Sequence, residues 1–556
     1  MSNSLICRFT IAALAATILL PSAASAQSAD DGSAVAKEKA APRAKVHRLA
    51  KRLKTSAPGR TLVMADMPVK AMPVKALPPV FSWSGFYVGG NIGYGVASNH
   101  AQGAFNDPAI GLLETSPVDT AVTPAGAIGG VQFGYNWQGG PNWLAGFETD
   151  FQGSAQKSTS CIIECADIPT VSTEALTISQ SLDYFGTVRG RLGYVDGSNL
   201  FYVTGGGAYG RVNQTVGLSA GAPGVATFSA AQSTSETRFG WTVGAGVESS
   251  LGGNWTAKVE YLYMNLGNTA TTLSAAVPAG APPLTLSAAS SFRDNIVRAG
   301  VNYRFGPPAG PISAYDAMAA VPPAVFSWTG FHVGANVGYG FGNDHSQVDL
   351  TQPPLVATSQ PGTSVAPRGG LGGVQLGYDW QGSPHWLAGF EADIQGTAMN
   401  DTVCSSLSCF NETNTVTSAS ATNFITVQHQ LDYFGTLRGR VGTIVNNTLF
   451  YVTGGGAYGH AKETLGFNSS VSVPALLIDQ TTAKDMFGYA VGGGVEAMVW
   501  RGWSVKAEYL YLDLGNFSQT VNLSSGALTG SLISNSTFHD HIVRVGANYH
   551  FNTGSY

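Results

Sequence analysis

The chain has 556 residues, of which 44% are hydrophobic and only 11% are charged, and it contains 70 glycines. Together with 10% aromatic residues, this composition favours an all-β protein with tight turns. The formal net charge of −5 argues against general nucleic-acid binding, so no nucleic-acid partner is expected.

The first 26 residues have the features of a secretory signal peptide. Arg8 precedes the apolar run FTIAALAATILL, and Ala24-Ser25-Ala26 supplies small residues for cleavage, which we place after Ala26. No later run reaches the length of a membrane-spanning helix. Any further membrane crossing therefore requires closed β-structure, because open strand edges cannot lie in lipid.

Residues 27–80 form a basic segment that contains the repetitive, proline-rich run MPVKAMPVKALPPV. We interpret this segment as a mostly disordered periplasmic tail. A sharper hypothesis is that its lysines and arginines contact anionic envelope polymers or lipid headgroups.

The remainder of the chain contains one domain twice. FSWSGFYVGGNIGYG from Phe81 returns as FSWTGFHVGANVGYG from Phe326, and LDYFGTVRGRLGY from Leu182 returns as LDYFGTLRGRVGT from Leu431. Repetition over this length indicates two copies of one fold. The copies are expected at residues 81–305 and 326–551, with a linker at 306–325 and a C-terminal extension at 552–556.

Each copy divides into eight candidate strands whose connections alternate in length. In the first copy the strands are expected near 84–96, 127–138, 142–154, 180–194, 199–212, 237–250, 254–267 and 293–305. The long connections 97–126, 155–179, 213–236 and 268–292 are rich in Ala, Ser, Thr and Gly, and we interpret them as loops. Short turns on one side and long loops on the other are typical of bacterial outer-membrane barrels.

Side chains alternate in character along the candidate strand 180–194. Leu182, Tyr184 and Val188 fall on one face. Asp183 and Arg189 fall on the other. An aromatic-rich apolar face opposite a face with spaced charges predicts a barrel with lipid outside and polar groups inside.

The charged residues of both copies are predicted to point into the barrels. An Arg or Lys at the lipid midplane costs about 2–4 kcal/mol, whereas buried charges of both signs form ion pairs. Such a network fills the interior of an eight-stranded barrel, so the barrel would conduct ions and small solutes poorly. The predicted barrel-interior charges are Glu148, Asp150, Asp183, Arg189, Arg191, Lys258, Glu260, Arg298, Arg304, Glu391, Asp393, Asp432, Arg438, Arg440, Lys506, Glu508 and Arg544.

No nucleophile with an acid/base pair is distinguished in either copy, so no catalytic, cofactor-binding or metal site is expected. His100 and His345 recur at matching positions after the first strand. We interpret them as interfacial residues, because no Ser or carboxylate constellation repeats with them. A catalytic role for these two histidines in an outer-membrane enzyme is a further functional hypothesis.

Two pairs of closely spaced cysteines occupy matching polar segments of the two copies. The pairs are Cys161 with Cys165 and Cys404 with Cys409. An exported, oxidising setting favours one local disulfide in each pair over free thiols or a metal site.

Five motifs carry a resemblance to a known family: SWSGFYVGGNIGYG, LDYFGTVRGRLGY, LFYVTGGGAYG, KVEYLYMNLG and NIVRAGVNYRF. They resemble the small outer-membrane β-barrel proteins often called "porin family", which are OmpA/OmpX-like surface antigens of Gram-negative bacteria. The resemblance implies an antiparallel up-and-down transmembrane β-barrel of eight strands in the outer membrane. It also implies roles in envelope integrity or host contact, with no catalytic residues.

The expected partners follow from a barrel in that membrane. They are the surrounding lipid and lipopolysaccharide, and the barrel-assembly machinery, which would read a C-terminal aromatic residue. Phe551 and Tyr556 are the candidates for that residue.

The linker permits either two tandem eight-stranded barrels or one fused sixteen-stranded barrel. Its length and the separate proline-rich lead-in of the second copy favour two barrels. The preferred function is then a structural and surface-interaction role. The alternative is a porin-type passive channel for small solutes, which requires the fused barrel or an open interior.

Overall fold

The computed structural model describes residues 82–552, except for 109–111, 163–165, 169–171, 222–227, 276–282, 307–326, 353–354, 360–361, 415–418, 471–475 and 526–527. The predicted signal peptide, the basic tail and nearly all of the linker lie outside the described residues, as do Cys165 and Tyr556. Among the described residues, no helix is long and apolar enough to cross a membrane.

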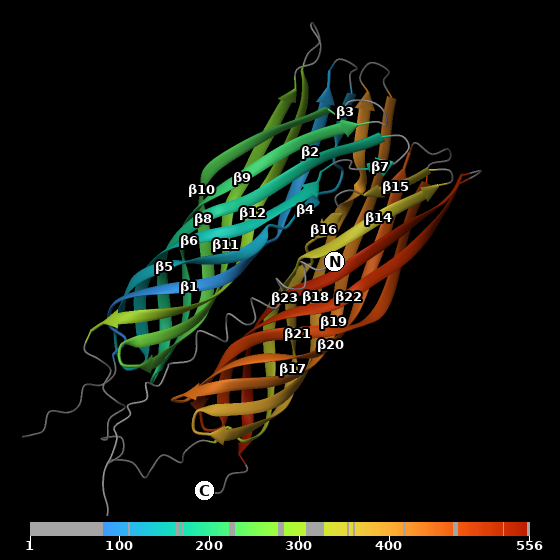
Figure 1. The fold of residues 1–556 in the computed structure, drawn as a ribbon. Coiled ribbons are helices and arrows are strands. Elements are labelled where there is room, and N and C mark those ends of the chain that lie inside the picture. The colour runs from blue at the N-terminus through green and yellow to red at the C-terminus, as the bar shows by residue number, and fades with distance from the viewer. Residues whose placement is uncertain are drawn as a thin grey trace, which may run out of the picture. The chain divides into compact units, whose positions relative to one another are not determined.

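Eight long antiparallel strands of the first copy pair in chain order (Figure 1). They are β1 (Gly85–Ala97), β5 (Ala125–Gln138), β6 (Trp143–Cys161), β8 (Ser172–Asp196), β9 (Asn199–Gly221), β10 (Phe228–Gly252), β11 (Trp255–Ala275) and β12 (Leu284–Phe305). The last strand returns to the first, because Phe86 of β1 lies opposite Phe305 of β12. The pairing therefore forms a ring of eight strands.

The second copy repeats this arrangement. Its long strands are β13 (Gly330–Gly342), β17 (Arg368–Ser383), β18 (Trp386–Asn414), β19 (Ala419–Val445), β20 (Thr448–Ser469), β21 (Leu476–Trp500), β22 (Trp503–Ser525) and β23 (Leu528–Asn552). Phe331 of β13 lies opposite Phe551 of β23, so this copy also closes on itself. The predicted all-β fold with two tandem eight-stranded barrels is confirmed, and the first strand does not pair with the last strand of the second copy.

One of the short turns shows why the hairpins form where they do. Gly197 has a φ of 57° in the turn between β8 and β9, and Asn446 has a φ of 56° at the matching place between β19 and β20. Glycine and asparagine are the residues that adopt this left-handed conformation most readily. The turn chemistry is therefore preserved although the residue differs.

The long connections predicted to be loops are mostly strand, and that prediction was wrong. β9 and β10 together cover most of 213–236, and β11 and β12 cover most of 268–292. Shorter strands occupy the other long connections: β2 (Asn99–Asp107), β3 (Leu112–Thr115), β4 (Thr120–Val122), β7 (Ala166–Ile168), β14 (Asp344–Gln352), β15 (Leu355–Ser359) and β16 (Thr363–Val365). The inward positions of these segments hold only scattered apolar residues, such as Val216, Leu273 and Leu286, among buried Ser, Thr and Gln, so the alternation of a half-buried strand was hard to detect.

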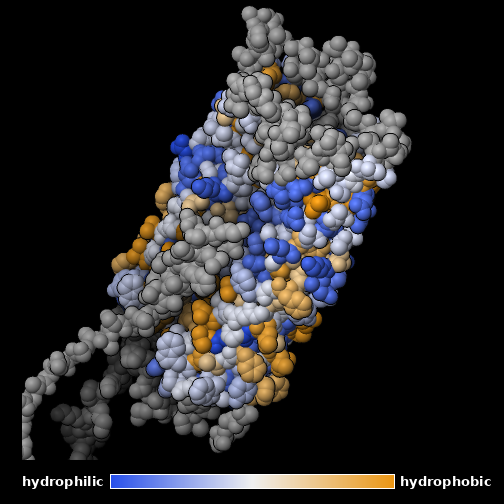
Figure 2. Space-filling model, turned by 45° about the vertical axis from the view of Figure 1, so that its right-hand side comes forward, coloured by the Kyte–Doolittle hydropathy of each residue, from blue (hydrophilic) through white to orange (hydrophobic). Residues whose placement is uncertain are grey.

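The outward-facing apolar residues of each copy gather in a belt beside the short turns. On β8 the belt runs from Tyr184, whose ring lies 5.6 Å from that of Phe151, to Tyr194. These tyrosines are ten positions apart, about 34 Å along a strand and about 24 Å along the membrane normal at a tilt of ~45°. That height matches the apolar band of a barrel in lipid. Figure 2 shows hydrophobic side chains gathered over the lower part of the visible face, with hydrophilic ones farther up.

The belt has corresponding members in both copies. In the first copy it comprises Phe86, Val88, Ile92, Val131, Phe133, Trp137, Trp143, Phe147, Phe151, Tyr184, Val188, Leu192, Tyr194, Val203, Phe239, Trp241, Val243, Trp255, Val301 and Phe305. In the second it comprises Phe331, Val333, Val337, Tyr339, Val374, Leu376, Trp380, Trp386, Phe390, Ile394, Tyr433, Leu437, Val441, Val452, Tyr458, Phe487, Tyr489, Val491, Trp500, Trp503, Val545, Tyr549 and Phe551.

Beyond the belt the polarity of the two barrel faces is reversed. On β9, Val212 and Val216 are fully buried, whereas Thr215 between them faces outward and bonds the exposed Ser233. The buried apolar residues of this far part form a cluster in the first copy: Ala101, Val122, Ile162, Leu176, Ile178, Val216, Leu273, Leu286 and Ala288. The far part is therefore packed as in a water-soluble sheet, with its apolar face inside and its polar face in solvent.

In each copy, a β-bulge at the edge of the belt away from the short turns places one predicted interior charge on the outside of the barrel. The pairing shifts by one residue between Leu182 and Tyr184, and again between Leu431 and Tyr433. Asp183 and Asp432, which lie within these bulges, were predicted inside, but Asp183 is half exposed beside Arg211 and Asp432 pairs with the partly exposed Lys462. The prediction failed because a one-residue shift turns every later side chain to the other face.

The belt predicts a depth-dependent cost for charge on one strand face. Val203 and Ser219 both face outward on β9, inside and beyond the belt respectively. We expect Val203→Arg to lower the free energy of unfolding in lipid vesicles by about 2–4 kcal/mol, and the matched control Ser219→Arg to change it by less than about 1 kcal/mol. Urea titration followed by tryptophan fluorescence measures both. Equal effects of the two variants would contradict the position of the belt.

Candidate functional site

The interior of the first barrel contains a layer of buried charges centred on Glu148. Its carboxylate accepts bonds from Arg189 Nη2 at 2.5 Å, from Lys258 Nζ at 2.7 and 2.9 Å, and from the Tyr87 hydroxyl at 2.8 Å. All four side chains are nearly inaccessible to solvent. Because these residues come from four different strands, the carboxylate links the walls of the barrel.

Two arginines extend this network across the barrel. Arg189 also binds Asp150 and Glu260, each at 3.0 Å. Arg298 binds Glu260 at 2.7 Å through Nε and Asp150 at 2.9 Å through Nη2. Each arginine is thus shared by at least two carboxylates, so the buried cations and anions compensate one another.

A third arginine lies closer to the short turns. Arg191 donates to Glu248 at 3.0 Å and to Asn136 at 2.8 Å. Its guanidinium also lies over the ring of Tyr87, 4.6 Å from the ring centre. A charge placed between a carboxylate and an aromatic face is stabilised from both sides.

The second barrel repeats the layer with its own residues. Glu391 accepts from Arg438 at 2.8 Å and from Lys506 at 2.7 Å. Arg544 binds Glu508 at 2.7 Å and Asp393 at 2.8 Å. The layer is therefore a property of the repeated domain.

The structure places all but two of the predicted interior charges inside the barrels. Asp183 and Asp432 are the two that lie outside. Three acidic members of the layers were missed in the sequence: Glu248, Glu496 and Asp379. A signal for the first two was present, because both occupy the same place in the repeated VGAGVES and VGGGVEA runs.

Apolar clusters enclose the charges on both sides. On the short-turn side of the first barrel lie Trp83, Leu144, Val195, Leu200 and Tyr202. On the other side lie Ala97, Ile128, Leu182, Phe185, Ala208, Val212, Leu262, Met264, Leu266, Phe292 and Ile296. Corresponding clusters occupy the second barrel, with Trp328 and Leu449 on one side and Phe434 and Phe538 on the other.

Farther from the short turns, the first barrel holds a small layer of neutral polar groups. Asn99 donates to Gln180 at 2.9 Å, and Gln180 donates to Gln214 at 3.1 Å. Ser290 also donates to Gln214, at 2.6 Å. All four residues are buried, so their hydrogen bonds replace those they would make with water.

The second barrel has charged residues at the matching places. His429 replaces Gln180, and its Nδ1 and Nε2 lie 2.8 Å from Asp344 and 3.1 Å from Glu463. Since both ring nitrogens face carboxylate oxygens, an imidazole protonated on both nitrogens can donate to both. The two barrels therefore differ in interior charge although their outer belts match.

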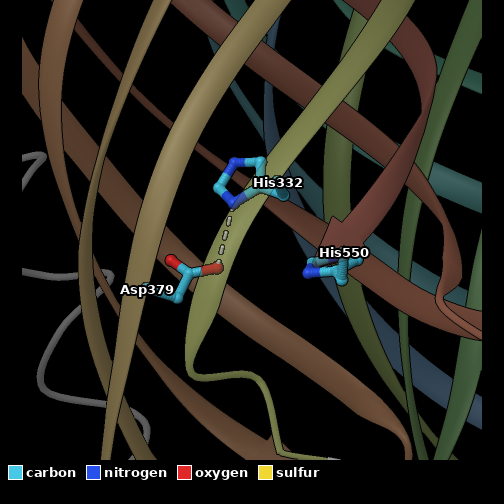
Figure 3. Close-up of side chains that lie close together, drawn as sticks. All are labelled: His332, Asp379 and His550. Carbon is cyan, nitrogen blue, oxygen red and sulfur yellow. Dashed lines mark ion pairs between the residues drawn. The ribbon is translucent and has the colours of Figure 1, made fainter. Parts of the chain in front are cut away.

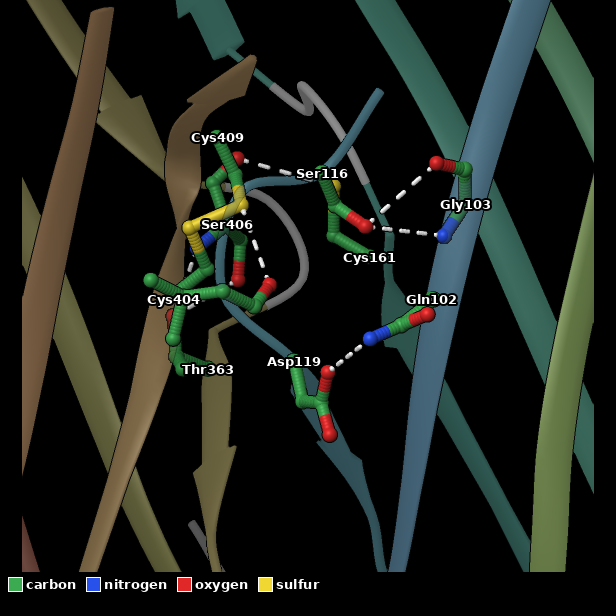
Figure 4. The surroundings of a disulfide bond; sticks show 10 residues. Gln102, Gly103, Ser116, Asp119, Cys161, Thr363, Cys404, Ser406 and Cys409 are labelled. Carbon is green, nitrogen blue, oxygen red and sulfur yellow. Dashed lines mark hydrogen bonds between the residues drawn. A yellow bond between two sulfur atoms is a disulfide. The ribbon is translucent and has the colours of Figure 1, made fainter. Parts of the chain in front are cut away.

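A disulfide joins Cys404 and Cys409 near the far end of β18 (Figure 4). Cys161 of the first copy is also disulfide-bonded, and its predicted partner Cys165 lies outside the described residues. Close to the second-copy disulfide, Thr363 and Ser406 are hydrogen-bonded at 2.8 Å. The pairing of β18 with β19 shifts register between Cys404 and Cys409, so the disulfide closes this irregular part of the strand.

The two repeated histidines lie beyond the belt and differ in environment. His345 of β14 is exposed, whereas His100 of β2 is partly buried. They are consequently placed on the part of each barrel that lies outside the apolar band, and not among the buried charges.

The residues 70–305 and 313–551 each match the model of the "outer membrane protein beta-barrel domain" family. The chain belongs to this family. Membership of this family places the protein in the outer membrane of a Gram-negative bacterium.

Characterised relatives resemble one copy at a time. The "31 kDa outer-membrane immunogenic protein" of Brucella melitensis biotype 1 is 38% identical over 219 residues, which are 38% of this chain and 82% of that protein. The "22 kDa outer membrane protein" of Rhizobium leguminosarum bv. viciae is 31% identical over 34% of this chain and 66% of its own length. The solved structure of Neisserial surface protein A matches 40% of this chain and 98% of its own, at 15% identity and a TM-score of 0.19.

The charge layer predicts unequal effects for two aspartates of the first copy. Asp150→Asn leaves Arg189 and Arg298 buried with one carboxylate fewer, so we expect a loss of about 3–5 kcal/mol in the free energy of unfolding. The matched control Asp183→Asn removes only an exposed pair and is expected to cost at most about 1 kcal/mol. Urea unfolding in lipid vesicles measures both variants. A loss at Asp183 as large as that at Asp150 would contradict the placement of these residues.

Proposed function

We propose that the two barrels are closed anchors that hold a strand-built surface outside the membrane, and that the chain serves envelope integrity and surface interaction. The observation that carries this proposal is that side chains fill the described part of each barrel interior in layers. Apolar clusters, paired charges and a further polar layer follow one another along the barrel axis.

The filled interior opposes the alternative of a passive channel. A solute crossing the first barrel would have to separate Arg189 and Arg298 from their shared carboxylates. Removing one partner of a buried ion pair costs about 3–5 kcal/mol, and here the pairs share partners, so several would open together. An eight-stranded barrel also has an interior that side chains fill.

The far part of each barrel supports the role in surface interaction. β8 begins twelve residues before Tyr184 at the edge of the belt, which is about 40 Å of additional strand. On β10 the run SAAQSTSETR from Ser229 is exposed or half-exposed along its whole length. A polar surface of this size, held rigidly by the barrel, is suited to contacts with other molecules. The Brucella melitensis relative, whose name calls it immunogenic, supports exposure of this surface on the cell.

The end of the second barrel supports recognition by the assembly machinery. Phe551 is 49% exposed in the belt and closes the ring against Phe331. An exposed aromatic residue on the last strand is available before closure, when that strand edge is still unpaired. The proposed lipid and lipopolysaccharide contacts involve the belt itself.

Conductance tests the closed interior. We expect the purified full-length chain in planar lipid bilayers to add no discrete current steps. Steps whose amplitude changes in the interior variant Arg191→Met would show that ions pass through a barrel, and the channel alternative would then replace this proposal.

Surface labelling tests the orientation. We expect a peptide epitope inserted within residues 222–227, between β9 and β10, to bind antibody on intact cells. The same epitope inserted after Gly197, in the opposite short turn, should bind only after the outer membrane is permeabilised. The reverse pattern would mean that the far part of the barrel faces the periplasm.

A further inference from the structure

The two barrels have different side chains at the end beside the short turns, which we call the mouth. In the first barrel, Tyr87 of β1 lies opposite Arg304 of β12. In the second, His332 of β13 lies opposite His550 of β23 at the same register positions. A third difference adjoins them, since Asn136 of β5 is replaced by Asp379 of β17.

These three second-copy residues converge inside the barrel (Figure 3). β13 pairs with both β17 and β23, so it brings His332 beside Asp379 and His550. All three are buried, and one potential ligand atom from each lies within 4.8 Å of the other two. The imidazole centres are 5.4 Å apart.

We propose that His332, Asp379 and His550 bind a divalent transition-metal ion of the zinc class. Two imidazoles and one carboxylate are ligands that suit Zn²⁺, whereas Mg²⁺ and Ca²⁺ prefer oxygen ligands alone. With metal–ligand bonds of about 2.0–2.2 Å, two atoms bound to one tetrahedral ion lie about 3.4 Å apart. The three potential ligand atoms, which lie within 4.8 Å of one another, therefore move closer together when the ion binds.

Carboxylates outside the proposed ligand set orient both imidazoles. Glu391 Oε2 lies 3.4 Å from Nε2 of His332, and Glu496 Oε1 lies 3.1 Å from Nε2 of His550. A metal-bound histidine donates its second ring N–H to such a carboxylate. Both rings would therefore bind the ion through Nδ1, and Nδ1 of His332 already lies 3.4 Å from Asp379 Oδ2.

Arg440 holds the acidic ligand in place. Its Nε donates to Asp379 Oδ1 at 2.8 Å, and its Nη2 contacts Oδ2. Its Nη1 donates to Glu496 at 2.9 Å. Hydrogen bonds of this kind orient a ligating carboxylate, and Oδ2 is the oxygen that turns from Arg440 toward the ion.

The balance of charge also favours a cation at this mouth. The first barrel places five cations and four carboxylates in its layer and mouth: Arg189, Arg191, Lys258, Arg298 and Arg304 with Glu148, Asp150, Glu248 and Glu260. The second places four cations and five carboxylates there: Arg438, Arg440, Lys506 and Arg544 with Asp379, Glu391, Asp393, Glu496 and Glu508. With neutral histidines the second barrel is more negative by two units, which is the charge of one divalent ion.

Zinc binding to the folded full-length chain tests this site. After treatment with a chelator, the protein is folded into detergent micelles with and without Zn²⁺, since the ligands are buried, and bound metal is counted after gel filtration. We expect one Zn²⁺ per chain and a higher unfolding temperature with zinc. Co²⁺ in place of Zn²⁺ should give the visible absorption of a tetrahedral site. Failure to retain any Zn²⁺ in the wild-type chain would overturn the proposal.

The first copy supplies matched variants. His332→Tyr, Asp379→Asn and His550→Arg each introduce the residue found at the same place in the first barrel, and each should weaken zinc binding at least tenfold. His345→Ala, at an exposed histidine of the same barrel, should leave it unchanged. Undiminished binding in all three site variants, or an equal loss in His345→Ala, would overturn the assignment.

If a site variant fails to fold, the Tyr87→His, Asn136→Asp and Arg304→His triple variant tests the site in the first barrel. A second bound Zn²⁺ is expected there, and its absence would overturn the proposed geometry.

Discussion

Lipid offers no hydrogen-bonding partner to a backbone amide or a charged side chain, and this constraint organises both barrels. Ring closure pairs the first strand of each copy with its last, so none of the described strands has an open edge within the belt. The charged residues of the same strand segments turn inward, where the carboxylates Glu148 and Glu391 link them into one layer per barrel. The paired layer then fills the space that closure creates.

The same strands serve two solvents in succession. Within the belt they place apolar groups outward and charges inward, and beyond it they place Ser and Thr outward and Val and Leu inward. The bulges between Leu182 and Tyr184 and between Leu431 and Tyr433 lie at this change. An extra residue changes which side chains point inward, and this accommodates the change of solvent along one continuous strand.

Duplication has preserved the outer belt and the central charge layer, whereas the polar groups on either side of that layer differ between the copies. The belts contain aromatic and aliphatic residues at most matching positions because lipid imposes the same requirement on both copies. Inside, a polar group is acceptable whenever its neighbours satisfy it, so Gln180 and His429 occupy equivalent places with different partners. This freedom allows the mouth of the second barrel to acquire His332 and His550 while its fold is unchanged.

The amino-acid sequence was enough to predict the duplication, the all-β class, the eight strands of each copy and the inward direction of most charges, because these follow from repeats and from alternation over a few residues. The sequence did not reveal the strand segments beyond the belt, because Ser and Thr concealed their alternation. It also gave the wrong direction for Asp183 and Asp432, because a bulge turns their side chains outward. The closure of each copy on itself is visible only in the strand pairing, since Phe86 and Phe305 are distant in sequence and the linker allowed either partner. The meeting of His332, Asp379 and His550 likewise depends on strand register across the ring, which is set by pairing and not by any local pattern.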